Sequence, residues 1–382
     1  MSSYLDYNAS APIDERVLDV MIDVYKNHMG NADSRTHNFG EDAREIVETA
    51  RKQVADLLGV SANEIIFTSG ATESNNIAIQ GLEEYGRQSG KKQIIITGIE
   101  HKAVLATSQA MKKRGFDVDV INPDLSGRVN PAEILGEIHD DTLLVSVMHV
   151  NNETGMIQPV AEIGEELSKR GVLFHVDATQ SCGKLVDELR NMKYNMLSLS
   201  AHKLMGPQGV GALVLRKKGY RALPLKPVFY GGQQERGIRP GTIPVALVAG
   251  CGKACEIAGE EHLENHERAA KLKRALIQEL EASGLKYHFN GDQNFCTDSA
   301  MNICIEGVNS EALMISTKQY CGVSNGSACT SKTYKPSYVL AAMGVPVDEI
   351  ECSIRVSWGA MTNVEDTVKN FRNMLRVARQ MQ

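Results

Sequence analysis

The stretch Ser198-Leu-Ser-Ala-His-Lys203 closes an apolar run that begins near Tyr194, and a glycine-rich sequence at 206–211 follows it. A lysine in this position can form an imine with a carbonyl cofactor, and a hydroxyl and an imidazole lie within three residues of it. Asp177 ends another apolar run upstream, where a carboxylate could pair with a protonated ring nitrogen. A lysine for the aldehyde, an acid for the ring and nearby donors for a phosphate together predict a pyridoxal phosphate site.

Apolar runs bounded by turn residues alternate with helical patterns through the first two-thirds of the chain. The best helical pattern covers residues 41–58, and Gly59 is a plausible stop for this helix. The predicted strands are residues 65–68, 94–97, 143–150, 172–176, 196–199 and 210–215. This alternation predicts an α/β fold with a mostly parallel sheet, helices on both faces, and functional residues at the carboxyl ends of the strands.

The later part of the chain predicts a second, smaller unit. Residues 230–242 contain four glycines and a proline, which is typical of a long structured loop. The elements expected after it are a long helix at about 264–282, a strand at 301–305, a helix at 311–320, a strand at 353–357 and a final amphipathic helix. We therefore expect a large domain of residues 15–255 and a smaller α+β domain formed by residues 1–14 and 256–382.

The composition is that of an ordinary globular protein, with 382 residues, 42% hydrophobic, 23% charged and a net charge of −6. A short basic cluster at 216–221 favours a solvated strand end over a nucleic-acid surface. No apolar run reaches the ~18 residues of a membrane span, and the N-terminus lacks the features of a signal peptide. The eight cysteines fit neither a zinc site nor a secreted disulfide framework. We expect a cytoplasmic protein without membrane, metal or direct nucleic-acid contacts.

Several polar residues follow predicted strands, and each has a plainer alternative. Thr72 lies at a predicted helix start, where backbone N–H groups could bind a phosphate or where the turn could simply cap the helix. His101 could stack on a ring and transfer protons, or it could be structural. Asn152 could contact a ring substituent or a substrate carboxylate, or it could shape a turn. Gln180 could bind a ring oxygen, but it is uninformative by itself.

Three further residues are candidates for chemistry. Asp177 would be buried and needs a partner, either a pyridinium N–H or an arginine or cap. Cys329 lies in Ser324-Asn-Gly-Ser-Ala-Cys-Thr-Ser331 near Lys332 and Lys335, and an exposed thiol near cations is a better nucleophile at neutral pH. The alternative is a loop cysteine without a role. Arg355 could clamp a carboxylate bidentately, although the local pattern alone favours a surface arginine on a strand.

These motifs, taken in order, resemble the cysteine desulfurases of the NifS/IscS type, which are fold-type-I pyridoxal phosphate enzymes of aminotransferase class V. The matching segments are residues 4–12, 30–40, 68–74, 100–104, 149–155, 175–184, 198–211, 235–242, 324–331 and 354–357. They cover nearly the whole chain, and their number and order make the resemblance specific. It implies a mostly parallel sheet of the seven-stranded type flanked by helices, with a smaller α+β domain.

The resemblance also implies a role for each candidate residue. Lys203 would bind the cofactor covalently and later carry protons, and His101 would stack on the ring as an acid and base. Cys329 would accept the sulfur, while Arg355 and Asn152 would hold the substrate carboxylate. The implied cofactor-binding residues are Lys203, Asp177, Gln180, Ser200, His202, Thr72, Ala71, Thr242 and Asn152. Because Thr242 would reach the phosphate of the other subunit, a homodimer with active sites at its interface is expected.

The implied activity converts L-cysteine to L-alanine and leaves a persulfide on Cys329. The persulfide sulfur would pass to an acceptor protein for iron–sulfur cluster assembly, tRNA thiolation or DNA phosphorothioation. The length of chain between Cys329 and a predicted helix near 337–343 fits the long-loop branch, which predicts direct transfer. Asn325 lies where many family members have serine. The stretch after Trp358 is shorter than in some relatives, which use a longer tail to dock a scaffold protein, so the resemblance does not identify the sulfur acceptor.

Three alternatives to this activity remain. One is a selenocysteine lyase, another is a different fold-type-I enzyme such as an aminotransferase, and the third is a catalytically silent scaffold. Cys329 in its loop disfavours an aminotransferase. A complete set of Lys203, Asp177, His101 and Cys329 disfavours a silent scaffold.

Overall fold

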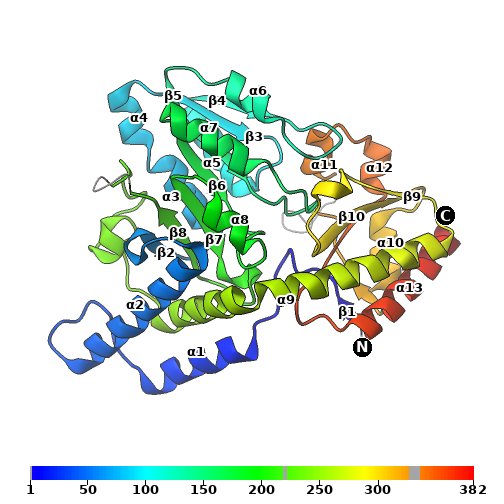
Figure 1. Ribbon diagram of the computed structural model, residues 1–382, viewed down its shortest axis with the longest axis horizontal. Helices are drawn as coiled ribbons and strands as arrows, with labels where there is room; N and C mark the ends of the chain where they lie inside the picture. The colour runs from blue at the N-terminus through cyan, green and yellow to red at the C-terminus, as the bar shows by residue number, and fades with distance from the viewer. Residues whose placement is uncertain (1, 218–221, 327–335) are drawn as a thin grey trace.

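The computed structural model describes residues 2–217, 222–326 and 336–382 (Figure 1). The predicted nucleophile Cys329, together with Lys332 and Lys335, lies outside the described residues. A larger α/β body surrounds a seven-stranded sheet, and a smaller body surrounds a three-stranded sheet. One long helix runs from the first body to the second (Figure 1).

The central sheet has the strand order β2-β8-β7-β6-β5-β3-β4. Of these seven strands, β8 is antiparallel to both of its neighbours, and the remaining pairs are parallel. The predicted α/β fold with a mostly parallel, seven-stranded sheet is therefore confirmed. The strands are β2 (Ile65–Thr68), β3 (Gln93–Thr97), β4 (Asp117–Ile121), β5 (Thr142–Met148), β6 (Leu173–Asp177), β7 (Met196–Ser200) and β8 (Gly211–Leu215).

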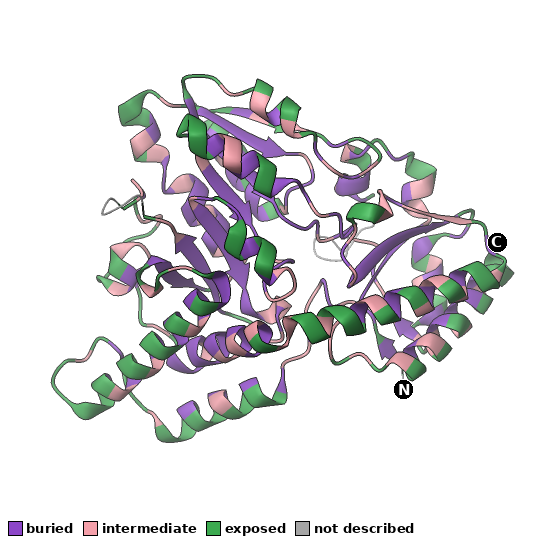
Figure 2. Ribbon diagram, in the orientation of Figure 1, coloured by how far each residue is buried: buried purple, intermediate pink, exposed green. Residues whose placement is uncertain are grey.

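Each face of this sheet is covered by its own set of helices, because successive strand side chains point to opposite faces. Ile95 and Val145 lie in a core with buried residues of α1, α2, α6, α7 and α8. Ile94 and Leu144 lie in a second core with α3 and α5, and α4 packs at its margin. β3 and β5 are buried along their whole length, which explains their uninterrupted apolar sequences (Figure 2). The helices are α1 (Glu15–Asn27), α2 (Asn38–Leu58), α3 (Ala71–Gln80), α4 (Glu83–Ser89), α5 (Lys102–Lys113), α6 (Pro131–Gly136), α7 (Val160–Arg170) and α8 (Val186–Asn191).

The smaller body is built on the antiparallel sheet β12-β10-β9 and a short parallel pair, β1 with β11. Its core includes Leu5, Trp358 and Phe371, so the two ends of the chain meet in it. The predicted strands at 301–305 and 353–357 and the helices at 311–320 and from 364 are confirmed. The elements are β1 (Ser3–Tyr4), β9 (Tyr287–Phe289), β10 (Ala300–Ile305), β11 (Cys321–Gly322), β12 (Ser353–Ser357), α10 (Ser310–Thr317), α11 (Tyr338–Ala342), α12 (Val347–Glu351) and α13 (Val364–Met381).

The long connecting helix is α9 (Val245–Ser283), which begins about five turns before the predicted start near 264. Its first half is buried on nearly every side and therefore lacks an amphipathic pattern that the sequence could reveal. Residues up to Ala258 belong to the core of the larger body, and residues from Ala269 belong to that of the smaller one. The predicted division at 255 falls within this helix and stays a prediction. Among the described residues, no helix, α9 included, has the length and apolar character needed to cross a membrane.

The glycine-rich segment 230–242 is fixed to the sheet by a buried ion pair. Arg51 of α2 donates to both carboxylate oxygens of Glu235 at 2.7 and 2.8 Å. The same carboxylate accepts from the backbone N–H of Phe67 in β2 at 2.6 Å. Both partners are almost completely buried, so the attraction between the two charges offsets the cost of removing each of them from water. The predicted structured loop is confirmed, and Thr242 follows closely after this anchor.

Candidate active site

A cavity of ≈ 410 Å³ lies at the carboxyl ends of β2, β5, β6 and β7. This is the edge at which ligands bind in open α/β sheets. Nine of the candidate residues line it: Ala71, Thr72, His101, Asn152, Asp177, Gln180, Ser200, His202 and Lys203. The structure thus brings together in one cavity residues that are up to 132 positions apart in the sequence, from Ala71 to Lys203. Their individual roles stay predictions.

Asp177 is the last residue of β6 and is 3% exposed. Its Oδ2 accepts from the side-chain amide of Asn75 in α3 at 2.8 Å. Its Oδ1 accepts from the backbone N–H of Thr179 at 3.0 Å and from the Thr179 hydroxyl. These contacts fix the carboxylate in one orientation at the cavity wall without placing a cation against it.

Lys203 ends a short helical turn, Ala201–Lys203, which follows β7 directly. Its Nζ donates to the backbone carbonyls of Asn8 and Ala9, each at 2.6 Å. The N-terminal segment of the chain therefore forms part of the wall opposite the sheet. Two of its hydrogen-bond partners are thus neutral carbonyl groups, which suits an amine that would exchange with a carbonyl ligand.

The start of α3 forms the end of the cavity that suits an anion. Gly70 is the N-cap residue with a φ of 146°, and no side chain caps the helix. The first N–H groups of a helix have no partners within it, and the helix dipole favours negative charge at this end. Ala71 and Thr72 begin the helix, and the hydroxyl of Ser200 faces Gly70. The arrangement fits the predicted phosphate position.

Two histidines of the cavity have lowered pKa values, which favour the neutral form of each ring at pH 7. Burial, followed by the charge of Lys203, lowers the pKa of His202 to about 4. Burial also lowers the pKa of His101, although the nearby carboxylate of Asp177 partly opposes this. His101 is the N-cap of α5, and its Nδ1 accepts from the backbone N–H of Ala103 at 3.1 Å. The remaining proton of the neutral His101 ring is therefore on Nε2.

Two buried amide oxygens test whether the cavity suits the predicted cofactor. Oδ1 of Asn152 and Oε1 of Gln180 have no hydrogen-bond partner among the described residues, and both side chains line the cavity. A buried polar atom without a partner costs about 1–3 kcal/mol, so a ligand with polar groups would relieve both. Pyridoxal phosphate carries a ring nitrogen, a phenolic oxygen and a phosphate, for which Asp177, Gln180 and the start of α3 supply matching groups. The residues present fit this cofactor.

Two of the candidate residues within the described part of the chain, Arg355 and Thr242, do not line this cavity. Arg355 is buried in β12, and its Nη2 pairs with Asp6 at 2.6 Å while its Nη1 donates to the carbonyl of Asn152 at 2.8 Å. Arg355 thus reaches the cavity wall through its hydrogen bond to Asn152. Thr242 is exposed and does not line the cavity of its own chain. Cys329 lies outside the described residues.

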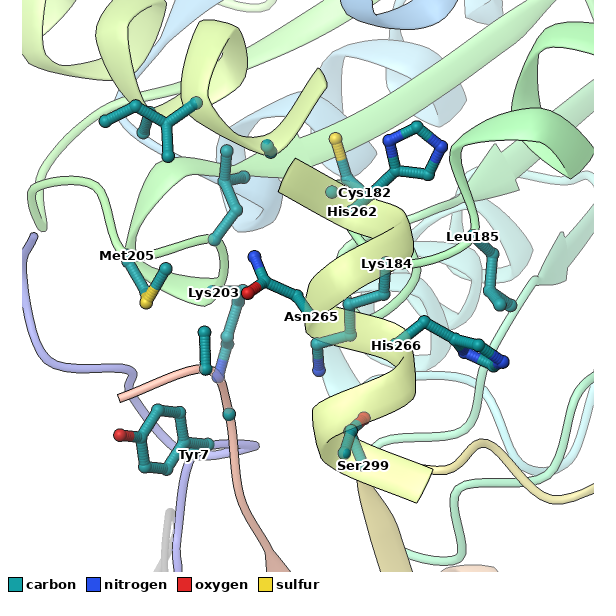
Figure 3. Close-up of a pocket in the computed structure, with 18 of the residues that line it drawn as sticks. Tyr7, Cys182, Lys184, Leu185, Lys203, Met205, His262, Asn265, His266 and Ser299 are labelled. Carbon is teal, nitrogen blue, oxygen red and sulfur yellow. The ribbon is translucent and has the colours of Figure 1, made fainter. Parts of the chain in front are cut away.

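A second, smaller cavity of ≈ 80 Å³ lies on the other side of Lys203, between α9 and the segment that follows β6. Figure 3 shows the side chains of Lys184 and Lys203 extending into it, with Asn265 nearby. Burial, and then the charge of Lys203, lowers the pKa of Lys184 to about 8. Lys184 is a neighbour of the site that the sequence reasoning missed.

Glu100 was also missed, although it adjoins His101. It is completely buried, and its Oε1 accepts from the Thr97 hydroxyl at 2.6 Å and from the Met148 backbone N–H at 2.8 Å. Its Oε2 has no partner among the described residues. Burial raises the pKa of this carboxyl to about 8, so the group is mostly protonated at pH 7. The available signal in the sequence was an acidic residue that follows closely after a buried apolar strand, β3.

The protonation of Glu100 predicts a pH-dependent stability. Because the folded state holds the proton more tightly than the unfolded state, unfolding releases it between the two pKa values, and the free energy of unfolding falls as pH rises. Glu100→Gln cannot titrate, so its stability relative to the natural protein should improve by about 3 kcal/mol from pH 5 to pH 8. Urea unfolding at several pH values measures this, with the exposed Glu133→Gln as the charge control. A difference that does not change with pH would contradict the assignment.

Comparison with known proteins gives the family. The family model for aminotransferase class-V matches residues 3–371. "Cysteine desulfurase IscS" of Anaeromyxobacter dehalogenans (strain 2CP-C) is 42% identical over 381 residues, which cover 99% of this chain and 93% of that protein. A solved structure described as "NIFS-LIKE PROTEIN" is 35% identical with a TM-score of 0.91 and covers 100% of both chains. Another, "SspA in complex with cysteine", is 34% identical with a TM-score of 0.81 and covers 93% of this chain and 98% of that one. The chain therefore belongs to the aminotransferase class-V family, and it is similar over almost its whole length to a cysteine desulfurase.

Proposed function

We propose that this chain is a pyridoxal phosphate-dependent cysteine desulfurase that converts L-cysteine to L-alanine and carries the sulfur as a persulfide on Cys329. The observation that carries the proposal is the convergence of Lys203, Asp177 and His101 on one cavity. The 42% identity to a cysteine desulfurase over 99% of the chain supports the same activity.

The chain's own groups suit each part of this reaction. When bound, pyridoxal phosphate supplies an electron sink for the substrate α-carbon. Lys203 would hold the cofactor and then move a proton at its Nζ, while the fixed carboxylate of Asp177 would accept a hydrogen bond from the ring nitrogen. The neutral His101 ring would lie against the cofactor with its Nε2 proton available for transfer.

Substrate binding would use the region where Arg355 and Asn152 meet. The guanidinium of Arg355 is almost completely buried and holds Asp6 at 2.6 Å. A substrate carboxylate would replace the Asp6 carboxylate on this fork, with the same charge and geometry. The unpaired Nε of Arg355 and the unpaired Oδ1 of Asn152 are available to support the bound amino acid.

The sulfur step requires a thiolate on the chain. The Cys329 sulfur would attack the sulfur of the bound cysteine, the carbon–sulfur bond of the substrate would break, and its electron pair with one proton would complete alanine. The Cys329 thiol thereby becomes a persulfide, so L-cysteine plus enzyme thiol gives L-alanine plus enzyme persulfide. A persulfide is released by attack of a second thiol, and we propose that an acceptor protein supplies that thiol.

Exposed apolar side chains support a homodimer. Leu18, Ile22, Tyr25 and Met29 form an exposed stripe along and just beyond α1, and Phe229 and Tyr230 are exposed near Thr242. Such surfaces are usually covered in an assembly. We propose that two copies associate and that Thr242 of each contacts the phosphate in the cavity of the other. Sedimentation of the holoenzyme should give the mass of a dimer.

The seven cysteines within the described residues are free thiols. This supports a reducing compartment, and we propose the cytosol.

The activity is tested by turnover of the purified holoenzyme. With L-cysteine and a thiol reductant, we expect alanine and sulfide in equal amounts. L-Selenocysteine and a 2-oxo acid serve as comparison substrates for a selenocysteine lyase and an aminotransferase. Turnover of selenocysteine without turnover of cysteine, or amino-group transfer without sulfide, would replace the proposed activity with one of these two.

A further inference from the structure

Glu153 lies next to the cavity residue Asn152, in the turn that follows β5, and is 2% exposed. Its backbone is fixed on both sides. The Glu153 N–H donates to the side chain of Asn151 at 2.8 Å, and its carbonyl accepts from the side chain of Asn302 in β10 at 3.0 Å. The turn thus joins the end of a strand of the larger sheet to the small-domain sheet.

The Glu153 side chain contacts both flanks of segment 327–335. Its Oε2 accepts from the hydroxyl of Ser337, the N-cap residue of α11, at 2.5 Å. On the other flank, Gly326 packs directly against the same carboxyl, since a Cβ on Gly326 would lie 2.3 Å from Oε2. Gly326 and Ser337 precede and follow the segment that contains Cys329. One buried carboxyl group therefore joins the two chain positions that bracket this cysteine.

Both flanks also form hydrogen bonds with residues that adjoin the cavity wall. Before the segment, Ser324 exchanges two backbone hydrogen bonds with Arg355, at 2.5 and 3.1 Å. After it, the Tyr338 hydroxyl donates to the carbonyl of Glu100 at 2.8 Å, directly before His101. Glu153 contacts both flanks at once.

The charge state of Glu153 suits this structural task. Burial raises the pKa of its carboxyl to about 7, while the hydrogen bond from Ser337 and the positive charges of Arg355 and Lys102 oppose the rise. A carboxyl group that is partly protonated near neutral pH can be held in a buried position at lower cost than a full carboxylate. A neutral amide of the same shape should then replace it with little loss.

We propose that Glu153 is a positioning residue for the sulfur-transfer step, because it fixes both ends of the segment that presents Cys329 to the substrate sulfur. The inference rests on the proposed function, in which Cys329 is the sulfur acceptor. Fixing the ends of a chain segment reduces its conformational freedom and raises the effective concentration of a group on it. Loss of this anchor should therefore slow the transfer of sulfur without weakening the binding of L-cysteine.

The experiment compares the binding constant for L-cysteine with the rate of sulfur transfer in variants of the holoenzyme. Binding is measured from the change in the cofactor spectrum as L-cysteine is added, and transfer is measured from alanine formed in a single turnover. For Glu153→Ala we expect transfer to fall by about 10–100-fold and the binding constant to stay within about twofold. Glu153→Gln keeps an acceptor for Ser337 and should restore most of the rate.

A glycine pair supplies the matched control. Gly326→Ala places a methyl group against the Glu153 carboxyl at a residue with a φ of 82°. Gly307→Ala imposes the same kind of backbone strain, at a φ of 75°, but its added methyl group meets nothing within 4 Å. We expect Gly326→Ala to slow transfer and Gly307→Ala to leave it unchanged. If Glu153→Ala does not fold, this pair decides the question.

The outcomes separate the two proposals. If Cys329→Ser keeps full alanine formation, the proposed function itself fails. If Cys329→Ser is inactive while Glu153→Ala or Gly326→Ala transfers sulfur at the natural rate, only the role of Glu153 is overturned. An equal loss in cysteine binding and transfer would also overturn it, because that pattern indicates general damage to the site.

Discussion

Lys203→Ala is expected to remove the visible absorption of lysine-linked pyridoxal phosphate and to lower turnover of L-cysteine by about 10²–10⁴-fold or more. The physical reason is that the Lys203 amine lies at the cavity, where its Nζ donates to two backbone carbonyls, while Asp177 and the start of α3 are arranged around the same space. Absorbance titration of the apoprotein with the cofactor, followed by an alanine assay, measures both effects.

Lys184→Ala is the matched control for this prediction. Lys184 is a second, partly buried lysine that lies near Lys203 but lines only the smaller cavity behind it (Figure 3). This variant should keep the visible band. If the Lys203→Ala protein still shows the band and the Lys184→Ala protein lacks it, the cofactor is attached to Lys184, and the assignment to Lys203 is wrong.

Cys329→Ser should have the second large effect, which is loss of sulfide and alanine formation by about 10³-fold or more with the cofactor band intact. Three of the other thiols offer poor replacements. Burial raises the pKa of Cys182, Cys304 and Cys321 to about 12, so few thiolates form there at neutral pH. A sulfide assay with L-cysteine measures the loss.

The control for the Cys329 prediction is Cys296→Ser. Cys296 is partly buried, and burial raises the pKa of its thiol. We expect this variant to turn over cysteine at the natural rate. Normal desulfuration by Cys329→Ser would show that another group accepts the sulfur.

The sequence predicted those parts of the fold that have either an uninterrupted apolar run or an apolar stripe at helical spacing. The strands of the sheet interior and the amphipathic α2 have such patterns. β4 was missed because it is an edge strand that carries Asp117 and Asp119 and is only partly buried. The first half of α9 was missed because a helix buried on most sides has no polar face to mark its period.

The site was predictable where a residue follows an apolar strand directly, as Asp177 and Ser200 do. It was not predictable where the function of a side chain depends on partners distant in the chain. Asn75 holds Asp177 from another element, and Glu153 joins Gly326 to Ser337. Such contacts have no local signature, because only the folded chain brings their members together. The pairing of Arg355 with Asp6 is of the same kind.

We propose that this chain removes sulfur from cysteine and holds it on Cys329. The most direct test is one turnover of the holoenzyme with L-cysteine and no reductant, followed by alkylation and mass spectrometry of the peptides. We expect alanine equal to the bound cofactor and one added sulfur on the peptide that contains Cys329. Alanine formed without added sulfur on that peptide, or added sulfur on a different cysteine, would contradict it.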